Sequence, residues 1–181
     1  MQRVKSHVDK LLDEYNSNRE TRHALRCHAC ESTSEAIHKA LSAKRIQKTV
    51  PISEVEAEEL IETVCTQDIR KYGLKFQNDL PTLEYTNDPK WMKTSGTWAE
   101  RLIEDICGEL AEHTSKLVAG MEENCAPNSQ ANGELHCNVN PFRFRACHRT
   151  TEICVREENR REHREKRSKK KRSKSKKNPE L

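Results

Sequence analysis

Hydrophobic side chains recur at helical spacing in three stretches of this 181-residue chain. The first stretch runs from Arg26 to about Ala43, where apolar or sulfur-bearing residues follow one another at intervals that keep them on one helix face. These residues are Cys27, Cys30, Ile37 and Leu41. We therefore expect a helix over this range, with both cysteines facing the protein interior.

The second stretch begins with a helix-capping signal. Ser53 is followed three residues later by Glu56, and this pair satisfies the free amides at a helix start. We expect the helix to continue toward Gly73, because glycine tolerates the backbone conformation that closes many helices. Its buried stripe is predicted to consist of Ile52, Val55, Leu60, Ile61, Val64, Cys65 and Ile69.

The third stretch starts with the same signal. Thr97 and Glu100 form a second capping box, and the apolar spacing that follows predicts a helix running to about Glu123. Its inward face is expected to contain Trp98, Leu102, Ile106, Leu110, Leu117 and Met121.

Residues 77–96, between the second and third stretches, read as a loop. They contain Pro81, Pro89 and Gly96, which interrupt regular structure. Trp91 is expected to anchor this loop.

The segment 124–154 has little periodicity but contains four of the eight cysteines, so disulfides would have to hold it in place. Its nearest approach to a strand pattern is NPFRFRAC, residues 140–147, where alternation lasts only about two periods. No strand pattern competes with the helical ones, and the body of the protein is therefore predicted to be all-α.

Composition limits how such a body is stabilised. Only 33% of the residues are hydrophobic, which predicts a thin core. Eight cysteines suggest covalent reinforcement, and disulfides require an oxidising compartment.

No apolar run of about 18 residues occurs, so no transmembrane segment is expected. Residues 1–26 contain no signal-peptide core; either a leader precedes Met1 or synthesis is cytosolic, and we favour the leader.

The charge is divided between the body and the C-terminal end. Residues 156–177 contain 13 Lys/Arg and 4 Glu, whereas residues 1–155 carry a net charge of −4. This segment has nothing apolar with which to build a core and is expected to be a disordered basic tail. Its densest part contains Lys166, Arg167, Lys169, Lys170, Lys171, Arg172, Lys174, Lys176 and Lys177.

Three interpretations of the basic tail remain open. In the first, the tail is a solvated spacer. In the second, it attaches to an acidic partner in a salt-dependent way, and in the third it serves nuclear import or nucleic-acid binding. The nucleic-acid interpretation is the least favoured, because the tail has no aromatic residue on which bases could stack.

The Cys27-x-x-Cys30 pair has a possible redox interpretation. A thioredoxin-like motif needs a strand before the pair and a helix dipole acting on an exposed thiol. Residues 9–26 are highly charged and show no strand pattern. Catalytic redox chemistry is therefore an alternative interpretation of this cysteine pair and not the leading one.

Zinc is a further interpretation, with Cys27 and Cys30 as half of a site. Candidates for the other half are Cys137 with Cys147, Cys147 with Cys154, or His148. Zinc would leave several cysteines unused, so we expect no metal. The sequence contains no constellation of nucleophile, base and orienting group, so we expect no catalytic residue, and it gives no reason to expect a cofactor. Structural disulfides are the leading interpretation of the eight cysteines.

Several sequence elements, taken in order, resemble the canopy family of endoplasmic-reticulum proteins. They are LRCHAC opening a helix, EELIETVC followed six residues later by YG, GTWAERL leading into a cysteine-bearing helix, a late cysteine cluster and a C-terminal PEL. The likeness covers about residues 24–154 and the end of the chain. It implies a saposin-like, disulfide-linked helical bundle in the lumen of the endoplasmic reticulum.

The resemblance also implies how the cysteines pair. Cys65 and Cys107 would form the middle bridge, and Cys27 and Cys30 would each bond one of the last four cysteines. Which two of those four take part stays open: Cys137, Cys147 and Cys154 are all candidates by spacing. Eight cysteines exceed the family's usual six, which implies an extra bridge, such as Cys125 with Cys137.

The predicted organisation has three parts. Residues 1–23 form an N-terminal extension, residues 24–155 the canopy-type domain and residues 156–181 the basic tail. The chain ends Asn178-Pro179-Glu180-Leu181, which matches a lumenal retrieval signal only in its last two residues.

The resemblance implies a non-catalytic co-chaperone for secreted or membrane clients of immunoglobulin or receptor type, working with other chaperones of the endoplasmic reticulum. The client surface is expected to involve the 77–96 loop, where Trp91 is exposed, and the acidic body. The alternatives are a thiol-disulfide oxidoreductase using Cys27 and Cys30, and a cytosolic or nuclear binding protein with a basic tail.

Overall fold

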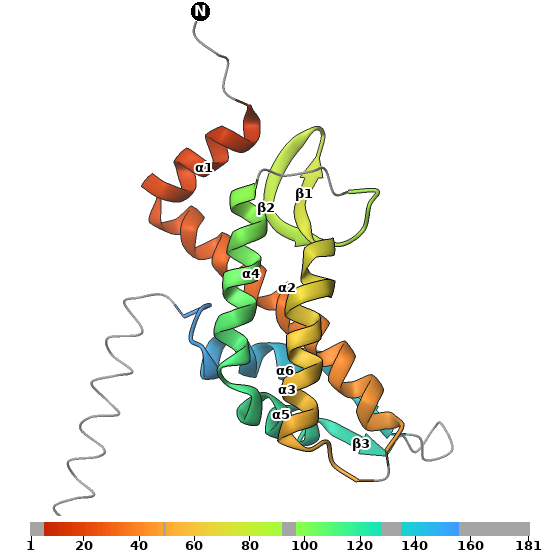
Figure 1. Ribbon diagram of the computed structural model, residues 1–181. Helices are drawn as coiled ribbons and strands as arrows, with labels where there is room; N and C mark the ends of the chain where they lie inside the picture. Colours follow the sequence, from red (N-terminus) through yellow and green to blue (C-terminus); the bar gives the residue numbers. More distant parts are fainter. Residues whose placement is uncertain (1–5, 49, 92–96, 128–134, 156–181) are drawn as a thin grey trace, which may run out of the picture.

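The computed structural model describes residues 6–48, 50–91, 97–127 and 135–155, and its fold is mainly helical (Figure 1). The long helix α2 runs through the molecule, and α3 and α4 pack along it. In chain order the elements are α1 (His7–Ser17), α2 (Arg19–Ile46), α3 (Glu54–Thr63), the π-helical η1 (Val64–Asp68), the 3-10 turn η2 (Ile69–Lys71), β1 (Gly73–Gln77), β2 (Leu80–Thr86), α4 (Thr97–Ala111), α5 (Thr114–Glu122), β3 (Cys125–Pro127), β4 (Leu135–Cys137), α6 (Val139–Phe144) and the π-helical η3 (Arg145–Thr150).

Helix α2 contains the first predicted helix and extends beyond both of its expected ends. The Asn18 side chain accepts hydrogen bonds from the amides of Glu20 and Thr21 and so caps the helix start. Its inward face is buried in the central cluster of the described hydrophobic residues, including Leu25.

Residues 7–17 form α1, which packs against α2 and buries Leu11 in the same cluster. The expected domain boundary after residue 23 falls inside α2. The part treated as an extension is therefore continuous with the helical body.

The capping box at the second helix is confirmed: the Ser53 side chain and the Glu56 side chain each accept from the other's backbone amide. The prediction that Val55 is buried is wrong, because its side chain is 65% exposed. The face that packs inward runs through Ala57, Ile61 and Val64, at helical spacing, and Val55 lies on the far side of the helix from that stripe.

The third predicted helix is divided into α4 and α5. The break occurs at His113, whose backbone leaves the helical conformation (φ −118°, ψ 26°). The Thr114 hydroxyl donates a 2.9 Å hydrogen bond to the carbonyl of Ala111, satisfying one acceptor at the end of α4. The capping box expected at Thr97 borders residues 92–96 and lies outside the residues whose contacts are described.

An antiparallel hairpin begins just before the expected loop and places its turn and second strand inside it, so the all-α prediction is wrong there. The helical run of α3, η1 and η2 ends at Lys71 with Tyr72 as its C-cap, next to Gly73 as predicted, and strand β1 begins at Gly73. Asn78 and Asp79 both have positive φ (50° and 63°), as a tight two-residue hairpin turn requires. Pro81 is the second residue of β2 and lies opposite Phe76, and a proline is tolerated in such an edge strand.

A second, shorter hairpin lies toward the other end of the molecule (Figure 1). It pairs β3 with β4, with Cys125 directly opposite Cys137. The segment NPFRFRAC is helical, as α6 and the start of η3, and it buries Phe142 while leaving Phe144 half exposed. The described part of the chain is thus a mainly helical fold with two small two-stranded sheets, whereas the sequence predicted an all-α bundle.

Candidate functional site

Two disulfides join the last described segment to α2. They link Cys27 with Cys154 and Cys30 with Cys147, over sequence separations of 127 and 117 residues. Cys27 and Cys30 are one helical turn apart, so each holds a different point of the returning chain. The resemblance left open which two of the last four cysteines they bond, and in the structure these are Cys154 and Cys147.

The other two disulfides follow the pairing that the resemblance implied. Cys65 of η1 bonds Cys107 of α4, and Cys125 bonds Cys137 across the second hairpin. All eight cysteines lie within the described ranges and none is free. Four disulfides fit a protein of an oxidising compartment and are compatible with a secretory or lumenal location.

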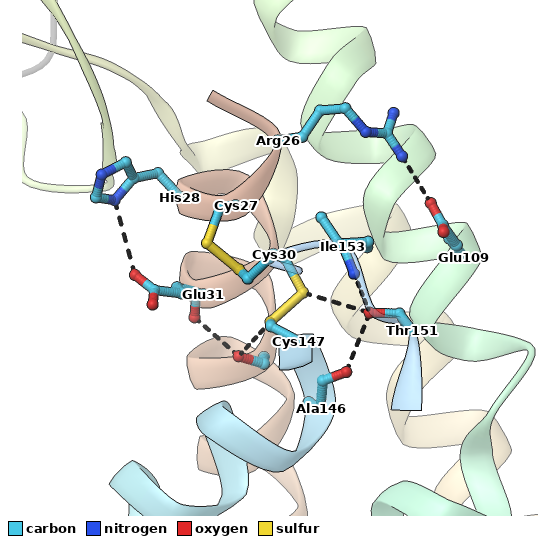
Figure 2. Close-up of a disulfide and its surroundings, with 12 residues drawn as sticks. Arg26, Cys27, His28, Cys30, Glu31, Glu109, Ala146, Cys147, Thr151 and Ile153 are labelled. Atoms are coloured by element: carbon cyan, nitrogen blue, oxygen red, sulfur yellow. Dashed lines mark hydrogen bonds and ion pairs between the residues drawn. A yellow bond between two sulfur atoms is a disulfide. The ribbon is translucent and has the colours of Figure 1, made fainter. Parts of the chain in front are cut away.

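The Cys30–Cys147 bridge joins α2 to η3 (Figure 2). Neither residue has any exposed surface. The Thr151 hydroxyl lies 4.0 Å from the sulfur of Cys30 and donates to the carbonyl of Ala146 at 3.0 Å. The Ser34 hydroxyl lies 3.7 Å from the sulfur of Cys147. These contacts exclude solvent from the bridge, so it acts as a structural cross-link.

The Cys27–Cys154 bridge has different surroundings. Cys27 is only partly buried, and the two sulfurs lie beside the side chains of Glu31 and His148. One donor atom from each of the four residues lies within 4.8 Å of the others. On its outer side, the Glu31 carboxylate faces His28 with an N–O distance of 3.7 Å (Figure 2).

This arrangement bears on the redox and zinc interpretations of Cys27 and Cys30. The two cysteines are not bonded to each other, as the oxidised form of a redox Cys-x-x-Cys would be. Cys30 also lies outside the group of four possible metal donors, so the half-site expected from the spacing is not formed. With Cys27 and Cys154 joined, two of the four donors are consumed in a disulfide.

The β1–β2 hairpin is the second candidate site. It exposes Leu80 next to its turn and Trp91 just after it, with 49% and 44% of their surfaces accessible. The carbonyl of Trp91 accepts a 2.8 Å hydrogen bond from the amide of Phe76, so the backbone is fixed while the indole is exposed. Sequence reasoning found Trp91 but missed Leu80, for which the Asn78-Asp79 turn was the available signal.

A cleft of about 380 Å³ lies beside this tryptophan. It is lined by Lys75, Gln77, Glu84, Tyr85, Thr86 and Trp91. Lys75 and Glu84 pair across the strands at 2.7 Å, and the hydrogen bond from Lys75 lowers the pKa of the Glu84 carboxyl. The ammonium of Lys90 lies 5.3 Å from the centre of the Trp91 ring. The exposed aromatic side chain is therefore surrounded by fixed charges of both signs.

Tyr85 fastens the hairpin to the helical body. Its side chain is buried, and its hydroxyl donates a 2.9 Å hydrogen bond to the carbonyl of Ala99 in α4. Burial raises the pKa of Tyr85 far above its usual value, so the phenol remains neutral and remains a donor. The hairpin thus presents its apolar side chains from a supported position.

The remaining site residues of the sequence analysis fall outside the described residues. They are the basic residues Lys166, Arg167, Lys169, Lys170, Lys171, Arg172, Lys174, Lys176 and Lys177, and the C-terminal Asn178, Pro179, Glu180 and Leu181.

Fold and cysteines together define a class: a mainly helical protein cross-linked by four disulfides. Among the described helices, none has the length and apolar character needed to cross a bilayer. No protein-family model matches the chain, and neither does a curated protein sequence or a solved structure.

Proposed function

We propose that this protein is a lumenal co-chaperone of the secretory pathway, which binds non-native or unassembled clients and does no chemistry on them. In this proposal it is a canopy-type protein, most similar to the member induced in plasma cells and marginal-zone B cells. Its clients are secreted or membrane proteins of immunoglobulin or receptor type. The supporting observation is the exposed hairpin surface, Leu80 and Trp91, carried on a covalently linked helical frame.

Several physical arguments favour client binding at this surface. Tryptophan supplies a large contact area with few rotatable bonds, and it is enriched among the residues that dominate binding energy. The neighbouring Lys75–Glu84 pair and Lys90 offer polar contacts at the rim of such an interface. A supported hairpin loses little entropy when it binds, which favours affinity.

The basic tail has a role in the same proposal. The basic tail attaches to an acidic partner, such as a chaperone of that compartment, through interactions that weaken as salt is added.

The alternatives have less support. An oxidoreductase using Cys27 and Cys30 would need the two thiols to act as a pair, whereas each bonds a different cysteine and Cys30 is fully buried. A cytosolic or nuclear binding protein would be expected to keep its thiols reduced, whereas all eight cysteines are bonded here.

The proposal predicts that Trp91→Ala weakens client binding by about tenfold or more, because an aromatic residue that anchors an interface typically contributes about 2 kcal/mol or more. The measurement is fluorescence anisotropy with a labelled, reduced and unfolded immunoglobulin domain. Phe144→Ala is the matched control, since Phe144 is an aromatic residue of similar exposure on α6. Equal weakening by both variants, or no binding by the unmodified protein, would contradict the proposal.

A further inference from the structure

The inference concerns the four residues around the outer disulfide. Cys27 and Glu31 are one helical turn apart on α2, His148 lies in η3, and Cys154 lies in the segment after η3. Their donor atoms are all within 4.8 Å of one another. Two sulfurs, one imidazole nitrogen and one carboxylate oxygen are a donor set that zinc accepts.

We propose that opening the Cys27–Cys154 disulfide converts this group into a tetrahedral zinc site. When a thiol reductant reaches the protein, the disulfide is lost and a zinc ion binds in its place. The inference does not depend on client binding. It assigns a function to Glu31 and His148, which the structural role of the disulfide leaves unused.

The chemistry requires a thiol reductant, such as a glutathione-type molecule. One thiolate attacks the disulfide to give a mixed disulfide, and a second thiolate releases it. Two electrons pass to the protein, giving two protein thiols and one disulfide of the reductant. Zn²⁺ then binds both sulfurs as thiolates, and two protons are released. The disulfide form of the same reductant reverses the sequence: it takes up two electrons to become two thiolates, the Cys27–Cys154 bond re-forms, and Zn²⁺ is expelled.

Only a small rearrangement is needed. Zinc binds sulfur at about 2.3 Å and nitrogen or oxygen at about 2.0–2.2 Å, so ligands at the corners of a tetrahedron lie about 3.3–3.8 Å apart. The sulfurs must separate from bonding distance to that spacing, and the other donors, now within 4.8 Å, must approach by about 1 Å.

The neighbouring bridge keeps the donors together after reduction. Cys30–Cys147 links the same two parts of the chain, one turn away from Cys27 on α2 and one residue away from His148. Both of its cysteines are fully buried, whereas Cys27 is partly exposed, so a reductant reaches the outer bridge first. Opening the outer bridge alone therefore leaves α2 and η3 tethered to each other.

Both protein ligands that are not sulfur already have supporting contacts. The His148 ring stacks on Phe144 with ring centres 4.6 Å apart, and His28 faces the Glu31 carboxylate at 3.7 Å. These contacts limit the orientations that the two side chains can adopt before metal binds.

The test uses the full-length protein, reduced mildly by a thiol and then freed of reductant without air. Alkylation and mass spectrometry identify the bridge that has opened. Two metal ions serve as probes. Cobalt(II) reports tetrahedral thiolate coordination by its absorption, and the affinity for zinc is measured in competition with a coloured chelator. The expected result is one metal ion per chain, bound after reduction and released on reoxidation.

Variants locate the metal. His148→Gln and Glu31→Gln retain all eight cysteines and are expected to weaken zinc binding by about tenfold or more. His7→Gln, at an exposed position on α1, is the control and should bind as the unmodified protein does. A Cys27→Ser/Cys154→Ser variant reports metal bound elsewhere, including at the partly exposed Cys125–Cys137 bridge.

Three results would overturn the inference. They are opening of other bridges while Cys27–Cys154 stays closed, metal binding by the double serine variant equal to that of the unmodified protein, and unchanged zinc affinity in His148→Gln. Circular dichroism of each variant in the oxidised state establishes that it is folded before metal is added.

Discussion

At the scale of single residues, His38 stands out because it is polar and almost fully buried in α2. Its ring lies against Phe142, with centres 5.1 Å apart, and its Nε2 has no hydrogen-bond partner within the described residues. Burial lowers the pKa of His38, with Glu35 opposing the shift and His136 adding to it. The folded protein therefore holds this imidazole neutral.

The lowered pKa makes stability depend on pH. The unfolded chain takes up a proton at His38 below its ordinary pKa of about 6.5, whereas the folded protein resists protonation. The contribution of His38 is fully present above that pH and is lost as the pH falls toward the lowered folded pKa. We expect the free energy of unfolding, measured by urea titration, to decrease as the pH is lowered from about 7 to about 5.

In His38→Gln, the free energy of unfolding is expected to fall less over this pH range, since glutamine does not titrate. His7→Gln, which removes an exposed histidine, should leave this decrease unchanged. A His38→Gln protein with the same pH profile as the unmodified one would show that the slope arises from other groups.

At the scale of secondary-structure elements, the hairpin depends on its attachment to α4. Tyr85→Phe removes the hydroxyl that bonds the carbonyl of Ala99 and keeps the buried ring. We expect a loss of about 1 kcal/mol in the free energy of unfolding, the usual net contribution of such a bond. Urea titration measures it, with Tyr72→Phe, at a more exposed tyrosine, as the control. A loss no larger than that of the control would mean that packing alone holds the hairpin.

The same scale shows which elements could be predicted from the sequence. The start of α3 could be predicted because Ser53 and Glu56 contact only their own helix start, so the signal is entirely local. The hairpin was missed because Pro81 was taken as a loop signal, although a proline is compatible with an edge strand. Val55 was misplaced because its burial depends on which helix face meets α5 and α2, and local apolar character does not specify that face.

At the scale of the whole molecule, the disulfides determine how far unfolding can proceed. Cys27–Cys154 and Cys30–Cys147 close nearly the same long loop, of 127 and 117 residues. Once either bridge is present, the other closes only a loop of about ten residues. The two bridges are therefore partly redundant in restricting the unfolded chain.

This redundancy predicts non-additive stability. Replacing either cysteine pair by alanine should cost about 3 kcal/mol from loop closure, because the partner bridge still closes the long loop. Replacing both pairs should cost about 8 kcal/mol, which exceeds the sum of the single losses. Denaturant unfolding of the three variants, without reductant, checks this. A double loss equal to or below the sum would show that the bridges do not share one loop.

The sequence alone determined the features that depend on neighbours within a few residues: three amphipathic helical stretches, the cap of α3 and, from the cysteine content, reliance on disulfides. The tertiary structure decided the rest. It selected Cys147 and Cys154 as partners, divided the third helix at His113, formed both hairpins and brought His148 beside Glu31. The choice of disulfide partners and the proximity of His148 to Glu31 depend on which surfaces pack together across more than a hundred residues of chain, and no local spacing encodes such distances.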